Sequence, residues 1–229
     1  MHIKFRPVGY LILTAIMAVI LTCPLTARAD STAEWYNKGT NLLRAGRYQE
    51  AINCFDRALE IDPKYVKAWN TKGAALSGLG RYQEAMDCYD RVLEIDTKYA
   101  PAWCNKGLVT RRMGRYQEAI KYYDRALEIN PKYTHAWNGK GYALASMGRY
   151  QEAINCFDRA LEIDPKYARA WANKGWVLNK MGMTPIEVLE CYEKALAKNP
   201  KHVPDWSKDK TPLAETPEYK QVKRAVDSR

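Results

Sequence analysis

The sequence predicts an all-α solenoid of antiparallel helix pairs, and three observations support this fold class. A tryptophan recurs every 34 residues without slippage, and a glycine follows each tryptophan by four positions. The string Gly-Arg-Tyr-Gln-Glu-Ala occurs four times at the same spacing. A fixed period of this length is typical of stacked units that each bury an apolar face against their neighbours. The tryptophans are Trp35, Trp69, Trp103, Trp137 and Trp171, and the glycines are Gly39, Gly73, Gly107, Gly141 and Gly175.

Composition and motifs argue against most other classes. Of the 229 residues, 47% are apolar and 27% are charged, which excludes a disordered tail and a multi-span membrane protein. The three histidines are too scattered for a histidine-based metal site. The chain has no CxxC, phosphate-binding loop, GxGxxG or GxSxG motif. We therefore expect a protein that is not an enzyme, with no catalytic residue, metal or cofactor.

The first 29 residues have the three parts of a secretory signal peptide. Lys4 and Arg6 give a positive start, residues 8–25 form an uncharged and mostly apolar run, and Ala27 and Ala29 form a small-x-small cleavage site. The sequence therefore predicts export to the periplasm or the cell surface.

Two alternatives to cleavage before Asp30 remain open. Residues 8–25 number 18, just enough for an uncleaved anchor in the cytoplasmic membrane. Lipidation at Cys23 is disfavoured, because Thr22 is a poor residue before a lipidated cysteine. All three possibilities place the rest of the chain outside the cytoplasmic membrane, with the basic start inside. The membrane is then a partner only through an uncleaved N-terminal segment.

Each period contains signals for two helices, called here the first and second helix of a pair. In the second copy the first helix is expected over residues 68–79 and closes at Gly80, and the second over residues 82–95. Small residues at Gly73 and Ala85 allow close approach of the two helices. A proline stops the second helix in most copies. The apolar bulk of this copy is expected from Trp69, Leu76, Tyr82, Tyr89 and Leu93.

This pattern resembles the tetratricopeptide repeat. The first copy has the family's signature residues at Trp35, Gly39, Leu42, Ala51, Phe55 and Pro63. The resemblance divides residues 30–201 into five copies, at 32–65, 66–99, 100–133, 134–167 and 168–201. It implies a right-handed superhelical solenoid that binds other proteins. One departure is Thr97, which stands where other copies have proline.

The other departure is a lysine in place of the family's leucine three residues after each tryptophan. These lysines could form an anion-binding stripe. We favour a structural role instead, in which their stems cover the packed surface and their amines pair with acids on neighbouring second helices. They are Lys38, Lys72, Lys106, Lys140 and Lys174.

Four cysteines precede the aromatic residue of the second helix. Equivalent atoms of stacked helices lie roughly 8–10 Å apart, whereas a disulfide needs Cα atoms within about 7 Å. Buried free thiols are therefore predicted at Cys54, Cys88, Cys156 and Cys191.

The C-terminal end is expected to cap the array. The fifth copy has one extra residue, and Thr184 with Glu187 rebuilds a capped helix start there. Residues 202–229 are interpreted as a degenerate capping segment. Trp206 is expected to anchor a decayed first helix, and residues 216–226 to form a last helix. Its inward residues would be Tyr219, Val222 and Val226.

The candidate binding surface follows from the resemblance, because the family binds proteins in a concave groove lined by the first helices. The groove positions differ most between copies, and they include seven basic residues or histidines and no acid. A groove of one charge sign concentrates ligands of the other sign. We expect a partner protein with an acidic and apolar segment; the alternative is that these are merely solvated helix faces. The candidate residues are Tyr36, Arg44, Lys67, Asn70, Leu108, Arg111, Arg112, His135, Asn138, Tyr142, Arg169, Trp176 and Lys180.

Several other functions fit the sequence less well than this scaffold. Nucleic acid is disfavoured, because acids repeat along the second helices and the basic residues are too sparse for many phosphate contacts. The residues of the family's clamp for chaperone C-termini are absent. The expected role is an adaptor in the assembly of an extracytoplasmic or membrane-associated complex. The alternatives are a membrane-tethered spacer and an accessory module of a glycosyltransferase-type enzyme system.

Overall fold

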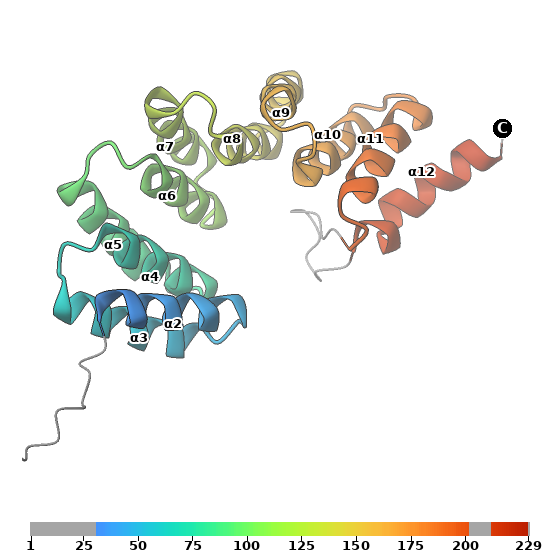
Figure 1. The fold of residues 1–229 in the computed structure, drawn as a ribbon. Helices are drawn as coiled ribbons and strands as arrows, with labels where there is room; N and C mark the ends of the chain where they lie inside the picture. The colour runs from blue at the N-terminus through green and yellow to red at the C-terminus, as the bar shows by residue number, and fades with distance from the viewer. Residues whose placement is uncertain (1–30, 202–211, 229) are drawn as a thin grey trace, which may run out of the picture.

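The computed structural model describes residues 31–201 and 212–228, which form an arch of paired helices (Figure 1). The predicted signal segment and Trp206 lie outside the described residues. Within the described ranges the chain contains only helices, so the predicted all-α solenoid of antiparallel helix pairs is confirmed. None of these helices has the length and hydropathy needed to cross a bilayer.

Five helix pairs follow one another along the arch. The first helices are α2 (Thr32–Arg44), α4 (Val66–Gly78), α6 (Ala100–Arg112), α8 (Thr134–Ser146) and α10 (Ala168–Lys180). The second helices are α3 (Tyr48–Ile61), α5 (Tyr82–Ile95), α7 (Tyr116–Ile129), α9 (Tyr150–Ile163) and α11 (Pro185–Lys198). In Figure 1, α6, α8 and α10 lie on the inner side of the arch, with α7 and α9 outside them.

The second pair shows why the repeated residues produce this unit. Gly80 has φ +78°, a left-handed conformation that lets the chain turn from α4 into α5. A Cβ on Gly73 would lie 2.6 Å from a ring carbon of Tyr89, so only glycine allows the two helices to pack this closely. Helix α4 begins at Val66, two residues earlier than expected, because the turn after α3 already ends at Tyr65.

The tryptophans are only partly buried and pack against the edge of the core, as Trp69 does. The side chains buried between α4 and α5 are Tyr89 and Leu76, at 1% and 2% exposure. Trp69 instead closes the loop before its helix, since its indole Nε1 donates to the carbonyl of Pro63 at 2.9 Å. Trp103 makes the same bond to Thr97 at 3.1 Å. Any residue offers a carbonyl, so this hydrogen bond is kept where Thr97 replaces the proline.

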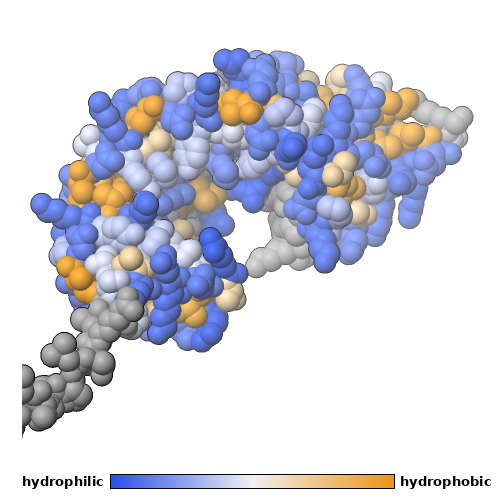
Figure 2. All heavy atoms as spheres, in the orientation of Figure 1, coloured by the Kyte–Doolittle hydropathy of each residue, from blue (hydrophilic) through white to orange (hydrophobic). Residues whose placement is uncertain are grey.

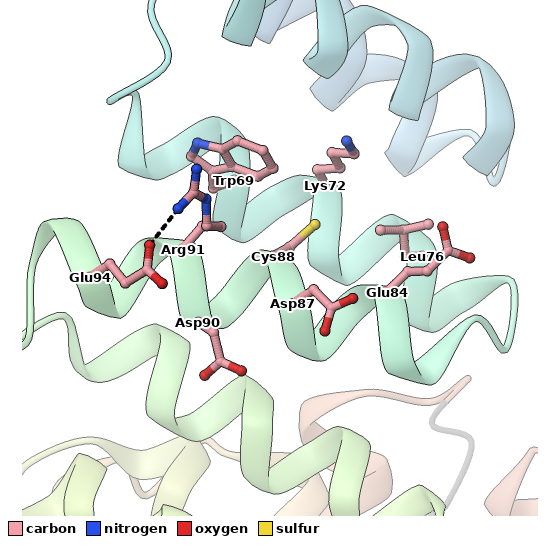
Figure 3. A pocket seen from close by; sticks show the side chains of 9 residues that line it. All are labelled: Trp69, Lys72, Leu76, Glu84, Asp87, Cys88, Asp90, Arg91 and Glu94. Carbon is pink, nitrogen blue, oxygen red and sulfur yellow. Dashed lines mark hydrogen bonds and ion pairs between the residues drawn. The ribbon is translucent and has the colours of Figure 1, made fainter.

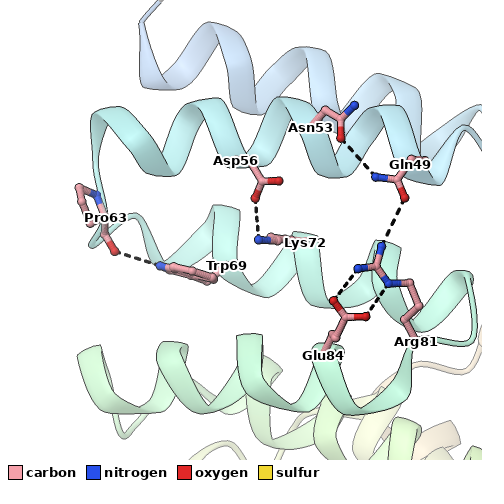
Figure 4. A network of polar contacts seen from close by, with 8 residues as sticks. All are labelled: Gln49, Asn53, Asp56, Pro63, Trp69, Lys72, Arg81 and Glu84. Atoms are coloured by element: carbon pink, nitrogen blue, oxygen red, sulfur yellow. Dashed lines mark hydrogen bonds and ion pairs between the residues drawn. The ribbon is translucent and has the colours of Figure 1, made fainter.

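Each lysine of the second to fifth copies pairs with an aspartate of the preceding second helix. The Lys72 Nζ lies 2.6 Å from Asp56 Oδ1, in a network that joins α3, α4 and α5 (Figure 4). The lysine amines also lie over the tryptophan rings, 5.2 Å from the Trp69 centroid in this copy. The structural interpretation of these lysines is therefore confirmed. The further pairs are Lys106–Asp90, Lys140–Asp124 and Lys174–Asp158.

The buried thiols are also confirmed. All five cysteines of the described chain are free and buried. Burial raises the pKa of Cys88 and of Cys156 to about 11. These thiols act as small apolar side chains of the core.

The first helix of the array has a polar outer face. In each later copy, two positions of the first helix hold alanine or valine with no exposed surface. One is the residue just before the tryptophan, such as Ala68, and the other is the residue six positions after it, such as Ala75. In α2 these positions hold Glu34 and Asn41. Solvated residues at the end of a repeat array are what solubility requires.

A short terminal helix covers the opposite end. Thr184 and Glu187 form the expected capping box at the start of α11. Beyond the 3-10 turn η1 (Leu213–Glu215), α12 (Pro217–Asp227) packs on α11. The Tyr219 hydroxyl donates to Glu193 at 2.8 Å. Glu193 stands at the position of the aspartates that pair with a lysine of the following copy, so Tyr219 takes the place of that lysine. Tyr219 and Val222 are buried as expected, whereas Val226 is only half-buried.

Candidate functional site

The candidate groove residues all lie on first helices. Figure 2 shows that the described part of the molecule is hollowed beneath the arch. Helices α6, α8 and α10 supply nine of the thirteen. They are Leu108, Arg111, Arg112, His135, Asn138, Tyr142, Arg169, Trp176 and, at the end of α10, Lys180. The other four lie on α2 and α4.

Four of these side chains form a continuous wall across three helices. The Arg111 guanidinium carbon lies 4.3 Å from the centroid of the Tyr142 ring. Tyr142 stacks on Trp176, with ring centroids 6.1 Å apart and planes inclined by 8°. Lys180 Nζ lies 6.0 Å from the Trp176 centroid on the next turn of α10. Two cations thus flank a stacked aromatic pair, and both kinds of contact hold the rings in fixed positions.

A pocket of about 80 Å³ opens beside this wall, and six candidate residues line it. None of the described residues in its lining is acidic. Those expected from the sequence are Leu108, Arg111, His135, Asn138, Tyr142 and Arg169. The other lining residues, which are outside the candidate set, are Cys104, Asn105, Tyr123, Tyr133, Gly139 and Tyr167. Tyr133 and Tyr167 stand where Tyr65 and Tyr99 end the same loop in the first two copies, so variation between copies did not single them out.

His135 lies between two of these tyrosines. Its ring centroid is 5.8 Å from that of Tyr133 and 5.3 Å from that of Tyr167. The pKa of His135 is lowered, first by desolvation against these rings although part of the ring is exposed, and then by the nearby Arg169 cation. Burial also raises the pKa of Cys104 to about 12, so its thiol is protonated at neutral pH.

The other candidates have structural contacts of their own. Tyr36 packs its ring edge-on against Tyr65, with centroids 5.2 Å apart. Arg112 donates to the carbonyl of Ser77 at 3.2 Å, which ties α6 to α4. Asn138 is only 4% exposed. Arg44 and Lys67 are exposed and lie outside the lining of the central pocket.

A larger depression of about 480 Å³ lies on α4 and α5 (Figure 3). Its acids include Glu84, Asp90 and Glu94, but each already has a basic partner in Arg81, Lys106 or Arg91. No group of three or more metal-ligating side chains occurs in the part of the chain that the structure describes. The charges here stabilise the helices and leave little attraction for a ligand.

The arrangement defines a class of protein, a helical-repeat scaffold with a basic and aromatic concave face. Family models of the tetratricopeptide repeat match residues 31–98, 64–132, 98–164 and 156–186. The chain belongs to the tetratricopeptide repeat (TPR) family, as the resemblance implied. A TPR repeat-containing protein of Methanocaldococcus jannaschii is 41% identical over 44 residues, which are 19% of this chain. The match spans only 13% of that relative's length.

Solved structures of the same fold agree with this assignment. A thermophilic TPR protein of Thermus thermophilus aligns with a TM-score of 0.68 and 20% identity, over 86% of this chain and 99% of its own. MamA aligns with a TM-score of 0.57 and 25% identity, over 76% of this chain and 94% of its own. YrrB is described as a TPR protein with an unusual peptide-binding site. It aligns with a TM-score of 0.52 and 25% identity, over 83% of this chain and 93% of its own. Family and neighbours together support a protein-interaction scaffold.

Proposed function

We propose that this chain binds a partner protein through an extended segment, rich in acidic and apolar residues, laid along α6, α8 and α10. The wall of Arg111, Tyr142, Trp176 and Lys180 is the observation that supports this most directly. Stacked aromatic rings offer rigid apolar surface at low entropic cost, and the flanking cations attract an acidic segment.

The proposed location is outside the cytoplasmic membrane. Support comes from the sequence of residues 1–29 alone, with its basic start, apolar run and small-residue cleavage site. The scaffold would then serve the assembly of an extracytoplasmic or membrane-associated complex. A tethered spacer without a ligand is the alternative, and it predicts no selective binding in the groove.

Selection from a random-peptide library with residues 30–229 as bait tests the proposal. We expect enriched peptides to combine Asp or Glu with apolar residues. Trp176→Ala should weaken the binding of these peptides by about 2 kcal/mol or more, as expected for a buried aromatic residue at the centre of an interface. Joint Arg111→Glu and Arg112→Glu substitution should slow association and reduce its salt dependence.

A matched control for the charge reversal replaces two arginines by glutamate outside the groove. Arg57 and Arg91 lie on the second helices α3 and α5 and pair with Glu60 and Glu94. Joint Arg57→Glu and Arg91→Glu substitution should leave peptide binding intact. Enrichment of basic peptides, or equal loss in both double variants, would contradict the proposed groove.

A further inference from the structure

The central pocket lies at a break in a repeated hydrogen bond between neighbouring first helices. Four junctions join the five copies, and at three of them the same two positions are hydrogen-bonded through their side chains. One is the residue that follows the tryptophan in a copy, and the other is the second residue after the tryptophan in the next copy. The bonded pairs are Tyr36–Thr71 at 3.5 Å, Asn70–Asn105 at 3.0 Å and Asn138–Asn173 at 3.0 Å. At the remaining junction these positions hold Cys104 and Gly139, and glycine has no side chain to bond.

Packing explains the glycine at this junction. A Cβ on Gly139 would lie 2.5 Å from Cζ of Tyr123 and 2.8 Å from its hydroxyl oxygen. The tyrosine ring of α7 therefore occupies the place of a side chain on α8. Without a bridging pair, a space of about 80 Å³ stays open between α6 and α8.

Two of the polar groups around this space, the guanidinium groups of Arg111 and Arg169, can only donate hydrogen bonds. Nε of Arg111 is buried and has no hydrogen-bond partner among the described residues. A buried N–H group without an acceptor is costly, so an arriving acceptor gains more here than on the open surface. Asn138 uses its Oδ1 to accept from Asn173, and its Nδ2 hydrogens take no part in that bond. Arg169 and His135 complete a lining without any acid.

We infer that this pocket is a subsite for one carboxylate side chain, Asp or Glu, of the bound segment. Arg111 Nε and Asn138 Nδ2 would donate to its oxygens, and Arg169 adds a second positive charge. Pockets for drug-sized ligands measure roughly 300–1,000 Å³, so a space this small suits a single side chain. The inference rests on the proposed function, because it assigns the position of one acid within the peptide.

The test is a coupling measurement with a peptide from the selection above. Each acid of the peptide is replaced in turn by its amide, and affinity is measured for the parent protein, Arg111→Gln and the control Arg91→Gln. Arg91 lies on the second helix α5, pairs with Glu94 and does not line the pocket. We expect one acid whose amide form binds at least tenfold more weakly to the parent protein and to Arg91→Gln. In Arg111→Gln the same replacement should have almost no further effect.

Two further arms identify the ligand chemistry and its contact. Phosphoserine at the coupled position should bind more weakly than glutamate; tighter binding would make the pocket a phosphate site and overturn the inference. The NMR signal of the Arg111 Nε–H, assigned by its loss in Arg111→Lys, should shift on binding of the acidic peptide and stay in place with the amide peptide.

The possible failures are distinguishable. If acidic peptides bind but no acid couples to Arg111, the subsite is wrong while the groove stands. If the selection enriches no acidic peptide at all, the proposed function fails, and the subsite fails with it.

Discussion

Removing Asp90 should destabilise the array much more than removing Lys106, although the two form one ion pair. The Lys106 side chain is 9% exposed and that of Asp90 is 51% exposed. Asp90→Asn replaces the carboxylate by a neutral amide, so a nearly buried ammonium loses its counter-ion; the Trp103 and Tyr122 ring centroids lie 5.7 Å and 4.9 Å from it. Lys106→Met leaves a carboxylate that water can solvate.

The magnitudes follow from this asymmetry. Breaking a fully buried pair by removing one partner costs about 3–5 kcal/mol, and exposed pairs contribute about 0–1 kcal/mol. Because one partner is buried and the other is half exposed, we expect Asp90→Asn to cost about 1–2 kcal/mol. Lys106→Met, which fits the apolar character of this position in the family, should cost about 0.5 kcal/mol or less. The double variant should resemble Lys106→Met, which gives a coupling energy of about 1–2 kcal/mol, equal in size to the cost of Asp90→Asn.

Thermal unfolding of residues 30–229, followed by circular dichroism, measures these differences. For a chain of this size, 1 kcal/mol corresponds to a shift of about 2–4 °C in Tm. The homologous pair Lys72–Asp56 provides a control, because Lys72 is 19% exposed and should show weaker coupling. Equal losses from Asp90→Asn and Lys106→Met, or additive losses in the double variant, would refute the reasoning.

Three other predictions concern packing, thiol chemistry and processing. A Cβ on Gly107 would lie 2.8 Å from a ring carbon of Tyr123, so Gly107→Leu should cost about 1–3 kcal/mol by overpacking, seen as a lower Tm; an unchanged Tm would contradict this packing. Burial raises the pKa of Cys88 to about 11 and of Cys104 to about 12, so both stay protonated and unreactive toward a disulfide reagent at pH 8. Reaction should begin only when denaturant is added, and prompt reaction in the native state would contradict their burial. The mature protein should begin at Asp30; an intact mass equal to the full chain in the membrane fraction would instead indicate an anchor.

Most of the fold could be predicted because its causes are local. Gly80 sets the turn between two consecutive helices, and Gly73 packs beneath Tyr89 of the same helix pair. Capping residues likewise bond within three positions of the chain. The partners of the lysines could be predicted only as acids on neighbouring helices. Which acid each lysine meets depends on how one pair crosses the next, and Lys106 reaches Asp90 sixteen positions back.

The candidate site was harder to predict, because it depends on contacts between copies. Variation between repeats pointed to Arg111 and Tyr142, but it could not show that they lie against each other. It also passed over Tyr167, whose position is tyrosine in each of the first four copies. Cys104 and Gly139 replace the hydrogen-bonded pair of the other junctions. The sequence reveals this replacement only when two different positions of adjacent repeats are compared.

The polar outer face of α2 determines how this array can change in length. Another helix pair placed before α2 would have to pack against Glu34 and Asn41, where internal junctions use alanine or valine. Such a junction would take the Glu34 carboxylate and the Asn41 amide out of water, at about 1–3 kcal/mol for each polar group. A duplicated copy inserted between existing repeats meets matching surfaces on both sides. Growth and shrinkage by recombination are therefore tolerated in the interior of the gene, and the 20 identical residues at 46–65 and 148–167 fit that history.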